Sequence, residues 1–276
     1  MSRITFTVGH DAEVFVYNEN DEATPGIGII DGSKRNPRSV PGGALQEDNV
    51  MAELNINPAK TSDEFVTNTL SVMDELNGLL SPHNLKFKVK AFQTFEPEFL
   101  KSKQAREFGC EPDSNIYTLS ENKIDVSNLV SKHARTAGGH IHLGLSDANF
   151  HPSARMSLVK ACDVFIGLPL ATVDDTMRKR FYGRAGSYRH KEYGIEYRTP
   201  SNIWLNSSDT MEWMFKQCSY VCNNVIRRLG IDDIPEAESI INDIGEDFLQ
   251  DIINQGFVDD AYDICERFQI QLPQGL

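Results

Sequence analysis

The sequence predicts an α+β protein with a largely antiparallel sheet and a helical C-terminal part. Short alternating or apolar segments separated by turn residues are frequent in the first part of the chain, and apolar residues at helical spacing follow from Asp209 onward. The 276 residues contain no repeat, linker or low-complexity stretch. We therefore expect one domain over residues 1–276, with an acidic helical extension at about 231–276.

The N-terminal part contains most of the expected strands. Residues 3–8 and 13–17 are apolar or β-branched, ENDEATPG has the composition of a turn, and IGIID at 27–31 resumes as a strand, which predicts a hairpin. ALQEDNVMAELNINP predicts a strand pair or one bent strand. Thr61 and Glu64 have the spacing of a capping box, so we expect a helix that begins there and ends before Pro82.

The remaining chain combines strands and helices. LKFKVKAFQTF at 85–95 alternates cleanly and predicts one strand, and TAGGHIHLG and YGIEYRTP predict two more. HPSARMSLVKACDVFIGLPLATV predicts a helix that is broken near Pro169. Beyond Asp232, Ile, Leu and Phe recur at helical spacing between acidic residues, which predicts amphipathic helices with a solvated face.

Composition is that of an ordinary soluble globular protein, with 40% hydrophobic and 24% charged residues. The N-terminus MSRITFTVGHDAEVF lacks the apolar core of a signal peptide, and no window approaches the roughly 18 apolar residues of a membrane span. We expect a cytoplasmic protein without membrane association. The scattered cysteines, without a CxxC pair, are expected to be reduced core residues: Cys110, Cys162, Cys218, Cys222 and Cys265.

The net charge of −13 belongs mostly to the C-terminal tail. Twelve of the 40 acidic residues lie between Asp232 and Glu266, with no Lys or Arg among them, so acids and bases nearly balance in the rest of the chain. Such a tail repels DNA and RNA, and no basic stripe with interleaved aromatics occurs elsewhere. We therefore expect no nucleic-acid partner, while an oligomer stays compatible with the sequence.

Four predicted strands carry polar residues at positions where an apolar residue would be ordinary. Residues two apart on a strand share one face, so each pair meets one environment. The residues are Asp11 and Glu13 in GHDAEVFV, Glu53 in MAELN with Glu47 and Asp48 just before it, His140 and His142 in GGHIH, and Glu196 and Arg198 in GIEYR.

Each of these patterns alone is typical of a half-exposed strand, and two histidines alone fit packing as well as metal ligation. If the strands form one sheet, however, their carboxylates crowd together, and two like charges about 4 Å apart cost about 1–4 kcal/mol. A compensating positive charge is therefore expected. Carboxylates with one imidazole suit Mg²⁺ or Mn²⁺, whereas zinc would require more His or Cys.

Basic residues gather in RKRFYGRAGSYRHKEYGIEYR. Arg178, Lys179 and Arg180 are consistent with a basic surface loop, whereas the arginines at 184, 189 and 198 lie among glycines and aromatics beside the predicted metal ligands. Planar guanidinium groups there can hold phosphoryl and carboxylate oxygens in pairs. Lys34 in DGSKRNP is a weaker candidate of the same kind. Metals with arginines indicate a nucleoside triphosphate.

In this order, the motifs GHDAE, QEDNVMAELN, TAGGHIHLG, RAGSYR and GIEYRTP resemble the phage-type carboxylate-amine ligase (amidoligase) family, a divergent relative of glutamine synthetase and glutamate-cysteine ligase. The resemblance spans residues 8–205, and the combination is more specific than any single motif. It implies a sheet of the glutamine synthetase catalytic-domain type within one amidoligase catalytic domain. The acidic C-terminal helices have no counterpart.

The resemblance also implies residue roles. Asp11, Glu13, Glu47, Glu53, His140 and Glu196 would hold metal ions, with Asp48 as the alternative to Glu47 because the spacing to Glu53 is shorter than in glutamine synthetases. Arg184 and Arg189 would bind nucleotide phosphates and act in catalysis with Glu53, Lys34 would assist in nucleotide binding, and Arg198 and His142 would bind substrate. The carboxylate that accepts the proton of the amine stays open.

The residues and the resemblance together predict an ATP-dependent ligase. ATP would bind with two or three Mg²⁺ or Mn²⁺ ions, and a substrate carboxylate would attack its γ-phosphorus to give an acyl phosphate. An amine would then displace phosphate and form an amide or peptide-like bond. The expected partners are small-molecule or peptide carboxylates and amines of unknown identity.

Two alternatives stay open. A metal-dependent hydrolase of the HxH type would also place two histidines on a strand, yet it needs further His ligands, and His151 and His190 lie in loop-like contexts. A binding protein that keeps the fold without catalysis is the other, although lost activity usually removes the buried charges first, and here they are complete. A requirement for ATP would separate the ligase from the hydrolase.

Overall fold

A large antiparallel sheet forms the centre of the computed structural model, which describes residues 5–106, 113–122, 133–146, 152–228 and 236–275. The strands are β1 (Phe6–Tyr17), β2 (Ala23–Thr24), β3 (Arg38–Val40), β4 (Gly43–Asp48), β5 (Met51–Ile56), β6 (Lys86–Lys88), β7 (Phe92–Thr94), β8 (Ser114–Asn115), β9 (Ser120–Glu121), β10 (Ala134–Thr136), β11 (Ile141–Leu145), β12 (Ser187–Lys191) and β13 (Gly194–Tyr197). Within the described ranges, an 11-stranded sheet has the order β3-β4-β5-β1-β11-β13-β12-β8-β9, with β2 and β6 also paired to β1. β7 and β10 form a separate pair.

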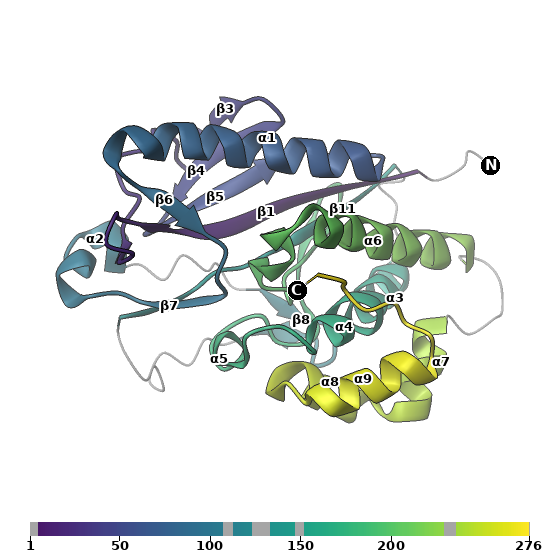
Figure 1. Ribbon diagram of the computed structural model, residues 1–276. Coiled ribbons are helices and arrows are strands. Elements are labelled where there is room, and N and C mark those ends of the chain that lie inside the picture. Colours follow the sequence, from purple (N-terminus) through teal and green to yellow (C-terminus); the bar gives the residue numbers. More distant parts are fainter. Residues whose placement is uncertain (1–4, 107–112, 123–132, 147–151, 229–235, 276) are drawn as a thin grey trace.

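Helices cover one face of this sheet (Figure 1). The helical elements of the described residues are α1 (Ser62–Leu80), α2 (Lys103–Arg106), α3 (Pro152–Cys162), the π-helical turn η4 (Asp163–Gly167), α4 (Leu168–Leu170), α5 (Thr176–Lys179), α6 (Ser208–Arg228), α7 (Glu236–Ile244), α8 (Glu246–Gln255) and α9 (Val258–Arg267), with 3₁₀ turns η1 (Ser81–His83), η2 (Pro97–Leu100) and η5 (Asn202–Asn206). Of these, α2 and η2 belong to a smaller cluster away from the main core. Figure 1 shows α1 and α6 lying across the sheet and α7, α8 and α9 forming an outer layer. The predicted α+β class with an antiparallel sheet is therefore confirmed. In the parts of the chain described, no helix is long and apolar enough to cross a membrane.

β1 organises the sheet because both of its edges are paired. Its first half pairs with β11, from Phe6 opposite Leu145 to His10 opposite Ile141. Its second half pairs with β5, where Glu13 lies opposite Glu53. Residues 3–8 and 13–17, predicted as separate strands, thus belong to one strand from residue 6 onward, because the GHDA segment between them stays extended.

The main core lies between the sheet and the helices. The even-numbered residues Val8, Ala12 and Val14 of β1 are fully buried in it, together with Ile141 of β11 and Ile195 of β13. A second, smaller cluster around Phe15, Tyr17 and Phe95 covers the opposite face at the end of β1. The two clusters leave the middle of that opposite face available for polar side chains.

The predicted start of α1 is confirmed, with a modified capping box. The Thr61 hydroxyl accepts a hydrogen bond from the Glu64 amide at 3.2 Å. The Glu64 carboxylate accepts one from the Lys60 amide at 2.7 Å, one residue before the usual partner. The helix ends at Leu80 and Pro82 lies in the following 3₁₀ turn, as the sequence predicts.

The C-terminal helices are amphipathic, as predicted. Ile240, Leu249, Ile252 and Ile264 are buried in the main core, while acidic side chains such as Asp251 are exposed. The acidic tail is therefore packed on the same core as the sheet. Cys162, Cys218, Cys222 and Cys265 are buried and unpaired, as predicted. Cys110 lies outside the described residues.

Two predicted strands are wrong. Residues 27–31 contain a turn at 27–29 and no strand, and Gly28 has a φ of +83° that does not fit an extended strand. Residues 85–95 form two short strands, because β6 pairs with β1 and β7 pairs with β10 in the separate sheet, so the chain bends between them. Alternation alone does not reveal that a strand changes partner.

The packing of β11 generates the first prediction. Ile141 is fully buried in the main core, so Ile141→Ala should lower the free energy of unfolding by about 2–5 kcal/mol. Denaturant unfolding measures this. Val258→Ala, at a position 39% exposed on α9, is the matched control and should change stability by less than about 0.5 kcal/mol. Equal effects of the two substitutions would contradict the assignment of Ile141 to the core.

Candidate active site

Most of the predicted site residues lie on the face of the sheet opposite the main core, because side chains alternate along a strand. Asp11 and Glu13 are odd-numbered in β1 and face away from the buried Ala12 and Val14. Pairing across the sheet continues this polar row. The facing pairs are Gln46 with Glu53, Glu53 with Glu13, Gly9 with His142, His142 with Glu196, and Glu196 with Arg189.

Asp11, His140 and Glu196 form a first group that could hold a metal ion, with ligand atoms within 4.8 Å of one another. His140 Nδ1 lies 3.1 Å from Asp11 Oδ1 and 3.9 Å from Glu196 Oε1. Burial, and then the positive charge of Arg198, lower the pKa of His140 to about 3. The imidazole is therefore neutral at physiological pH and keeps a lone pair for a metal. Burial would raise the pKa of Asp11, but interactions with His142 and His140 outweigh it and hold this pKa well below 3.8.

Glu13, Asp48 and Glu53 form the second such group, again with ligand atoms within 4.8 Å. Burial, followed by repulsion from the other two carboxylates, raises the pKa of Glu13 well above 4.5. Burial, followed by repulsion from Asp11 and Asp48, does the same to Glu53. A divalent cation would relieve this repulsion, and an all-oxygen ligand set suits Mg²⁺ or Mn²⁺. The residues present thus fit the expected metal ions.

Glu47 lies outside both groups, contrary to the prediction. Its carboxylate accepts hydrogen bonds from the Gly28 amide at 2.7 Å and from Gln104 Nε2 at 3.0 Å. The reason is strand parity: Glu47 lies opposite Ala52, whereas Gln46 and Asp48 point to the face that carries Glu53. Asp48, the alternative from the sequence, takes the place of Glu47 in the second group.

The glycine before the histidine motif has a steric role. A Cβ at Gly138 would overlap the imidazole of His140. The Gly138 amide also donates a hydrogen bond of 2.7 Å to the Glu13 carboxylate. One backbone segment therefore contacts a residue of each metal group.

These residues line a cavity of about 300 Å³, called here the carboxylate cavity. Its walls are Asp11, Glu13, Lys34, Pro37, Gln46, Asp48, Glu53, Asn55, His140, His142, Arg189, Lys191 and Arg198. Lys34 is exposed at the cavity, and its charge opposes the rise in the pKa of Asp48 that burial causes. The cavity thus combines acids from both groups with four basic side chains.

Three of these basic side chains converge on Glu196, which is fully buried. Arg189 lies 3.3 Å and Lys191 2.7 Å from its carboxylate, and Arg198 is also ion-paired with it. Sequence reasoning missed Lys191, although it lies two residues after Arg189 and so shares its face. Glu196 and Arg198, predicted to share one strand face, thus form an ion pair.

Arg198 connects the carboxylate cavity with its surroundings. Its guanidinium donates to the Tyr182 hydroxyl, which lies 3.3 Å from His140 Nε2, and its Nε lies 3.5 Å from Asp113 Oδ2. Burial raises the pKa of Asp113 above 3.8. No sequence pattern pointed to Asp113 or Tyr182, because both reach the site through contacts distant in the chain.

Arg178 and Lys179 are buried, and the prediction of a surface loop is wrong for both. Arg178 Nη1 and Lys179 Nζ donate to the Thr199 carbonyl at 2.9 and 2.8 Å, and Lys179 pairs with Asp174 at 3.2 Å. These contacts fix the chain directly after Arg198. Arg180 is exposed, as predicted.

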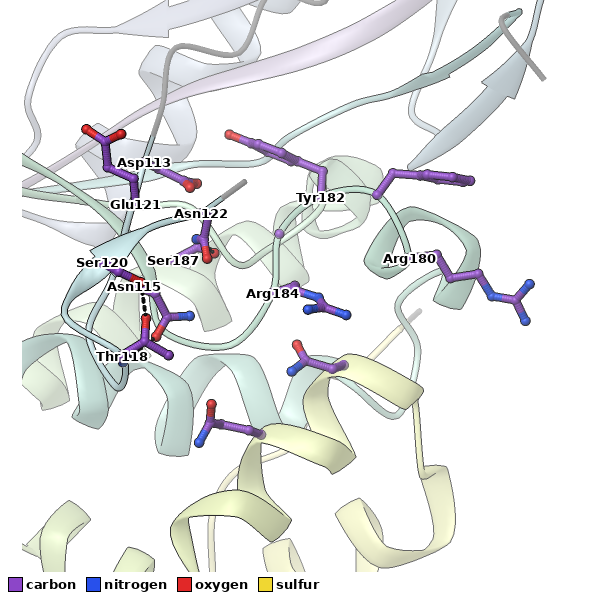
Figure 2. Close-up of a pocket in the computed structure, with 14 residues that line it drawn as sticks. Asp113, Asn115, Thr118, Ser120, Glu121, Asn122, Arg180, Tyr182, Arg184 and Ser187 are labelled. Carbon is purple, nitrogen blue, oxygen red and sulfur yellow. Dashed lines mark hydrogen bonds between the residues drawn. The ribbon is translucent and has the colours of Figure 1, made fainter. Parts of the chain in front are cut away.

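Arg184 does not lie with Arg189. It lines another cavity, of about 600 Å³, which we call the second cavity (Figure 2). The walls of the second cavity are Asp113, Asn115, Thr118, Ser120, Glu121, Asn122, Arg180, Phe181, Tyr182, Gly183, Arg184, Ser187, Gln250 and Asn254. Asp113 and Tyr182 thus contact Arg198 and also line the second cavity.

The other histidines are unequally placed. His142 Nε2 lies 3.1 Å from Asp11 Oδ2, and its ring stacks on Tyr193 at 5.9 Å between centroids. His190 is exposed on β12, and His151 lies outside the described residues. His10 packs against Phe65 and Trp204 on the core side.

A family model of carboxylate-amine ligases matches part of the chain. Residues 130–239 match the model of the family described as Phage phiEco32-like COOH.NH2 ligase-type 2. This confirms the resemblance to phage-type carboxylate-amine ligases found in the motifs, and the matched segment includes His140, Glu196 and Arg198. No curated protein matches the chain.

Solved structures similar to the chain have low identity to it. Apo GmaS without ligand is 11% identical with a TM-score of 0.37, and the alignment covers 99% of this chain and 71% of that one. A bifunctional glutathione synthetase from Pasteurella multocida is 12% identical with a TM-score of 0.42, covering 96% and 52%. A GmaS/ADP complex is 10% identical with a TM-score of 0.36, covering 99% and 72%. The chain thus spans about half the length of the glutathione synthetase.

The crowded carboxylates generate the second prediction. The pKa of Glu53 is raised above its unfolded value of 4.5, so its contribution to stability is present below that value and is lost as the pH rises through the raised pKa. Glu53→Gln should therefore stabilise the metal-free protein in EDTA at neutral pH, by about 1–2 kcal/mol, and this gain should fade in acid. Saturating Mn²⁺ should stabilise the wild type more than the variant.

Thermal unfolding across pH, with EDTA or Mn²⁺, measures both effects. The control is Glu75→Gln, at an exposed position on α1, which should show neither a pH-dependent gain nor a smaller response to Mn²⁺. A loss of stability in Glu53→Gln that is the same at every pH would contradict the repulsion.

Proposed function

We propose that the protein is an ATP-dependent ligase that joins a carboxylate to an amine through an acyl phosphate. The observation that carries the proposal is the pair of groups, Asp11, His140 and Glu196 beside Glu13, Asp48 and Glu53. All of these residues except the fully buried Glu196 line one cavity with Arg189 and Arg198, and both arginines are ion-paired with Glu196. Two divalent ions flanked by guanidinium groups suit a triphosphate and its transferred phosphoryl group. The family match over residues 130–239 supports the same reaction class.

Divalent ions bound to the two groups would neutralise charge on the β- and γ-phosphates of ATP. Arg189 reaches the same cavity from β12 and is proposed to contact the transferred phosphoryl group. Lys34 lies at the opposite, Asp48 side of the cavity and is proposed to contact the nucleotide phosphates. Both side chains lie at the carboxylate cavity, so their positive charges would offset the negative charge of the ATP phosphates there.

Arg198 is proposed to bind the carboxylate substrate. It is buried and ion-paired with Glu196, and a ligand carboxylate would compete for the same guanidinium. Asp113 and Tyr182 hold the guanidinium from the other side, so its position does not depend on Glu196 alone. His142, on the neighbouring strand, is proposed as a further substrate contact.

The reaction has two steps. A carboxylate oxygen of the substrate attacks the γ-phosphorus, the bond to the β-phosphate oxygen breaks, and ADP leaves with that electron pair. The amine nitrogen then attacks the acyl carbon, the bond to the phosphate oxygen breaks, and phosphate leaves. The proton lost by the nitrogen passes to a carboxylate, for which Glu53, whose pKa is raised, is proposed.

The structure favours neither alternative function. In the described part of the chain, each potential metal group contains at most one histidine, whereas an HxH hydrolase would use more. For an inactive binding protein, the buried repelling carboxylates would be a cost without a compensating role.

Metal-dependent turnover of ATP tests the proposal. With Mg²⁺ and ATP, a screen of paired carboxylates and amines should release ADP only when both are present. In EDTA, calorimetry with ATP should show little heat, because the acidic cavity repels the triphosphate until metal ions lie between them. Tight ATP binding in EDTA, or hydrolysis of substrates without ATP, would contradict a ligase of this kind.

Glu196 and Arg198 should fail in different ways, although their side chains touch. Glu196→Gln removes a charge from the first metal group, so Mn²⁺ affinity and ATP turnover should fall at least about tenfold, even at saturating carboxylate. Arg198→Lys keeps the charge but loses the planar fork, so Mn²⁺ and ATP affinity should survive while the KM for the carboxylate rises at least about tenfold.

Calorimetry and steady-state kinetics on both variants measure this separation. Arg267→Lys, at an exposed arginine of α9 outside both cavities, is the control for Arg198→Lys. If Arg198→Lys lost ATP binding and kept its carboxylate affinity, Arg198 would belong to the phosphate site instead.

A further inference from the structure

The second cavity has a volume of about 600 Å³, twice the 300 Å³ of the carboxylate cavity. The proposed function places no substrate in it. Its size is in the range of small-molecule sites. Its wall consists mainly of hydroxyl, amide and charged side chains, with Phe181 and Tyr182 as aromatic exceptions. Such a wall selects a polar ligand over an apolar one.

Charges of opposite sign lie on different sides of the second cavity. Figure 2 shows Asp113 and Glu121 at one end and Arg184 across from them. A ligand that carries an ammonium group and a carboxylate matches this division, because each charged end meets a side chain of opposite sign. A ligand with only one charge would leave one end of the cavity unused.

The turn that carries Arg184 is fixed from several directions. The Ala185 amide donates to Asn254 Oδ1 at 2.8 Å, and the Ala185 carbonyl accepts from Asn115 Nδ2 at 3.0 Å. The Arg184 carbonyl accepts from the Thr199 hydroxyl at 2.9 Å. Gly186 has a φ of +75°, and a Cβ there would overlap the ring of Tyr117. The backbone position of Arg184 is therefore set by the fold.

The side chain of Arg184, in contrast, has no partner among the residues that the structure describes. Among the described residues its guanidinium forms neither a hydrogen bond nor an ion pair, although it lines the cavity. A fixed backbone with an uncommitted guanidinium is suited to a planar anion such as a carboxylate.

Asp113 marks the end of the second cavity that is nearest to the proposed chemistry. It is buried, and its carboxylate lies 3.5 Å from Nε of Arg198, the residue proposed to hold the carboxylate substrate. A carboxylate has acceptor capacity for more than one donor, so Asp113 can also bind an ammonium group. An amine bound there would lie next to the carboxylate that it is to attack.

We propose that the second cavity binds the amine substrate as an amino acid, with its carboxylate on Arg184 and its ammonium group on Asp113. The inference rests on the proposed function in naming this ligand the acceptor. The binding site itself does not require ATP, metal ions or turnover. It also assigns the acidic C-terminal helices a part in the site, since Gln250 and Asn254 of α8 belong to the wall.

Calorimetry on the full chain in EDTA, without ATP, tests the proposal with the twenty standard amino acids, β-alanine and 4-aminobutyrate as probes. At least one should bind, and its carboxyl-amidated and N-acetylated forms should bind at least about tenfold more weakly, as expected for the loss of a charged hydrogen bond. Arg184→Gln and Asp113→Asn should each weaken the binding of the free amino acid by a similar factor.

Two control variants locate the ligand. Asp74→Asn, at an exposed position on α1, should leave binding unchanged. Asp48→Asn, in the carboxylate cavity, should also leave it unchanged, because the second cavity does not include Asp48. Arg184 is exposed, so its variant keeps the test valid even if Asp113→Asn does not fold.

Three results would overturn the inference: no probe binds, the amidated form binds as well as the free amino acid, or Asp48→Asn removes binding as strongly as Arg184→Gln. The proposed function fails on a different result, which is the absence of ADP release with metal and ATP. Amino acid binding without turnover would therefore retain the site and reject the ligase, and turnover without amino acid binding would do the reverse.

Discussion

Repulsion between carboxylates on one face of the sheet is the constraint on which the site depends. Antiparallel pairing places Glu13 opposite Glu53, and Asp48 comes close to both. The opposite face of the same strands holds the main core, so the acids cannot separate without loss of packing. On the other side of β1, strands β12 and β13 carry the basic residues around Glu196. A metal-bound triphosphate between these halves would complete the charge balance.

Strand periodicity is why much of this site could be predicted from the sequence. Pairs of polar residues two apart identified the shared face at Asp11 and Glu13, and the structure brings both to the carboxylate cavity. Glu47 shows the limit of this reasoning. The turn between β4 and β5 sets Asp48 opposite Met51, and this register alone decides that Glu47 points away. A turn one residue longer would have reversed the two.

The parts of the site that could not be predicted depend on contacts distant in the chain. Arg184 and Arg189 are five residues apart in sequence, but the turn at Gly186 directs them to different cavities. Arg178 and Lys179 have the composition of a surface loop, and only the Thr199 carbonyl and Asp174 explain their burial. The second cavity joins two-residue strands to a C-terminal helix, and neither pattern carries a local signal of binding.

The hydrogen bond from Ala185 to Asn254 joins α8 to the floor of a cavity, although α8 lies in the outermost layer of the molecule. The two faces of this helix are therefore under different selection. Exposed acids such as Asp251 are free to vary in evolution as long as the surface stays soluble, whereas Asn254 and Leu249 are constrained by the site and by the core. Variation among related sequences should follow the turns of this helix, with a conserved stripe on its inner side.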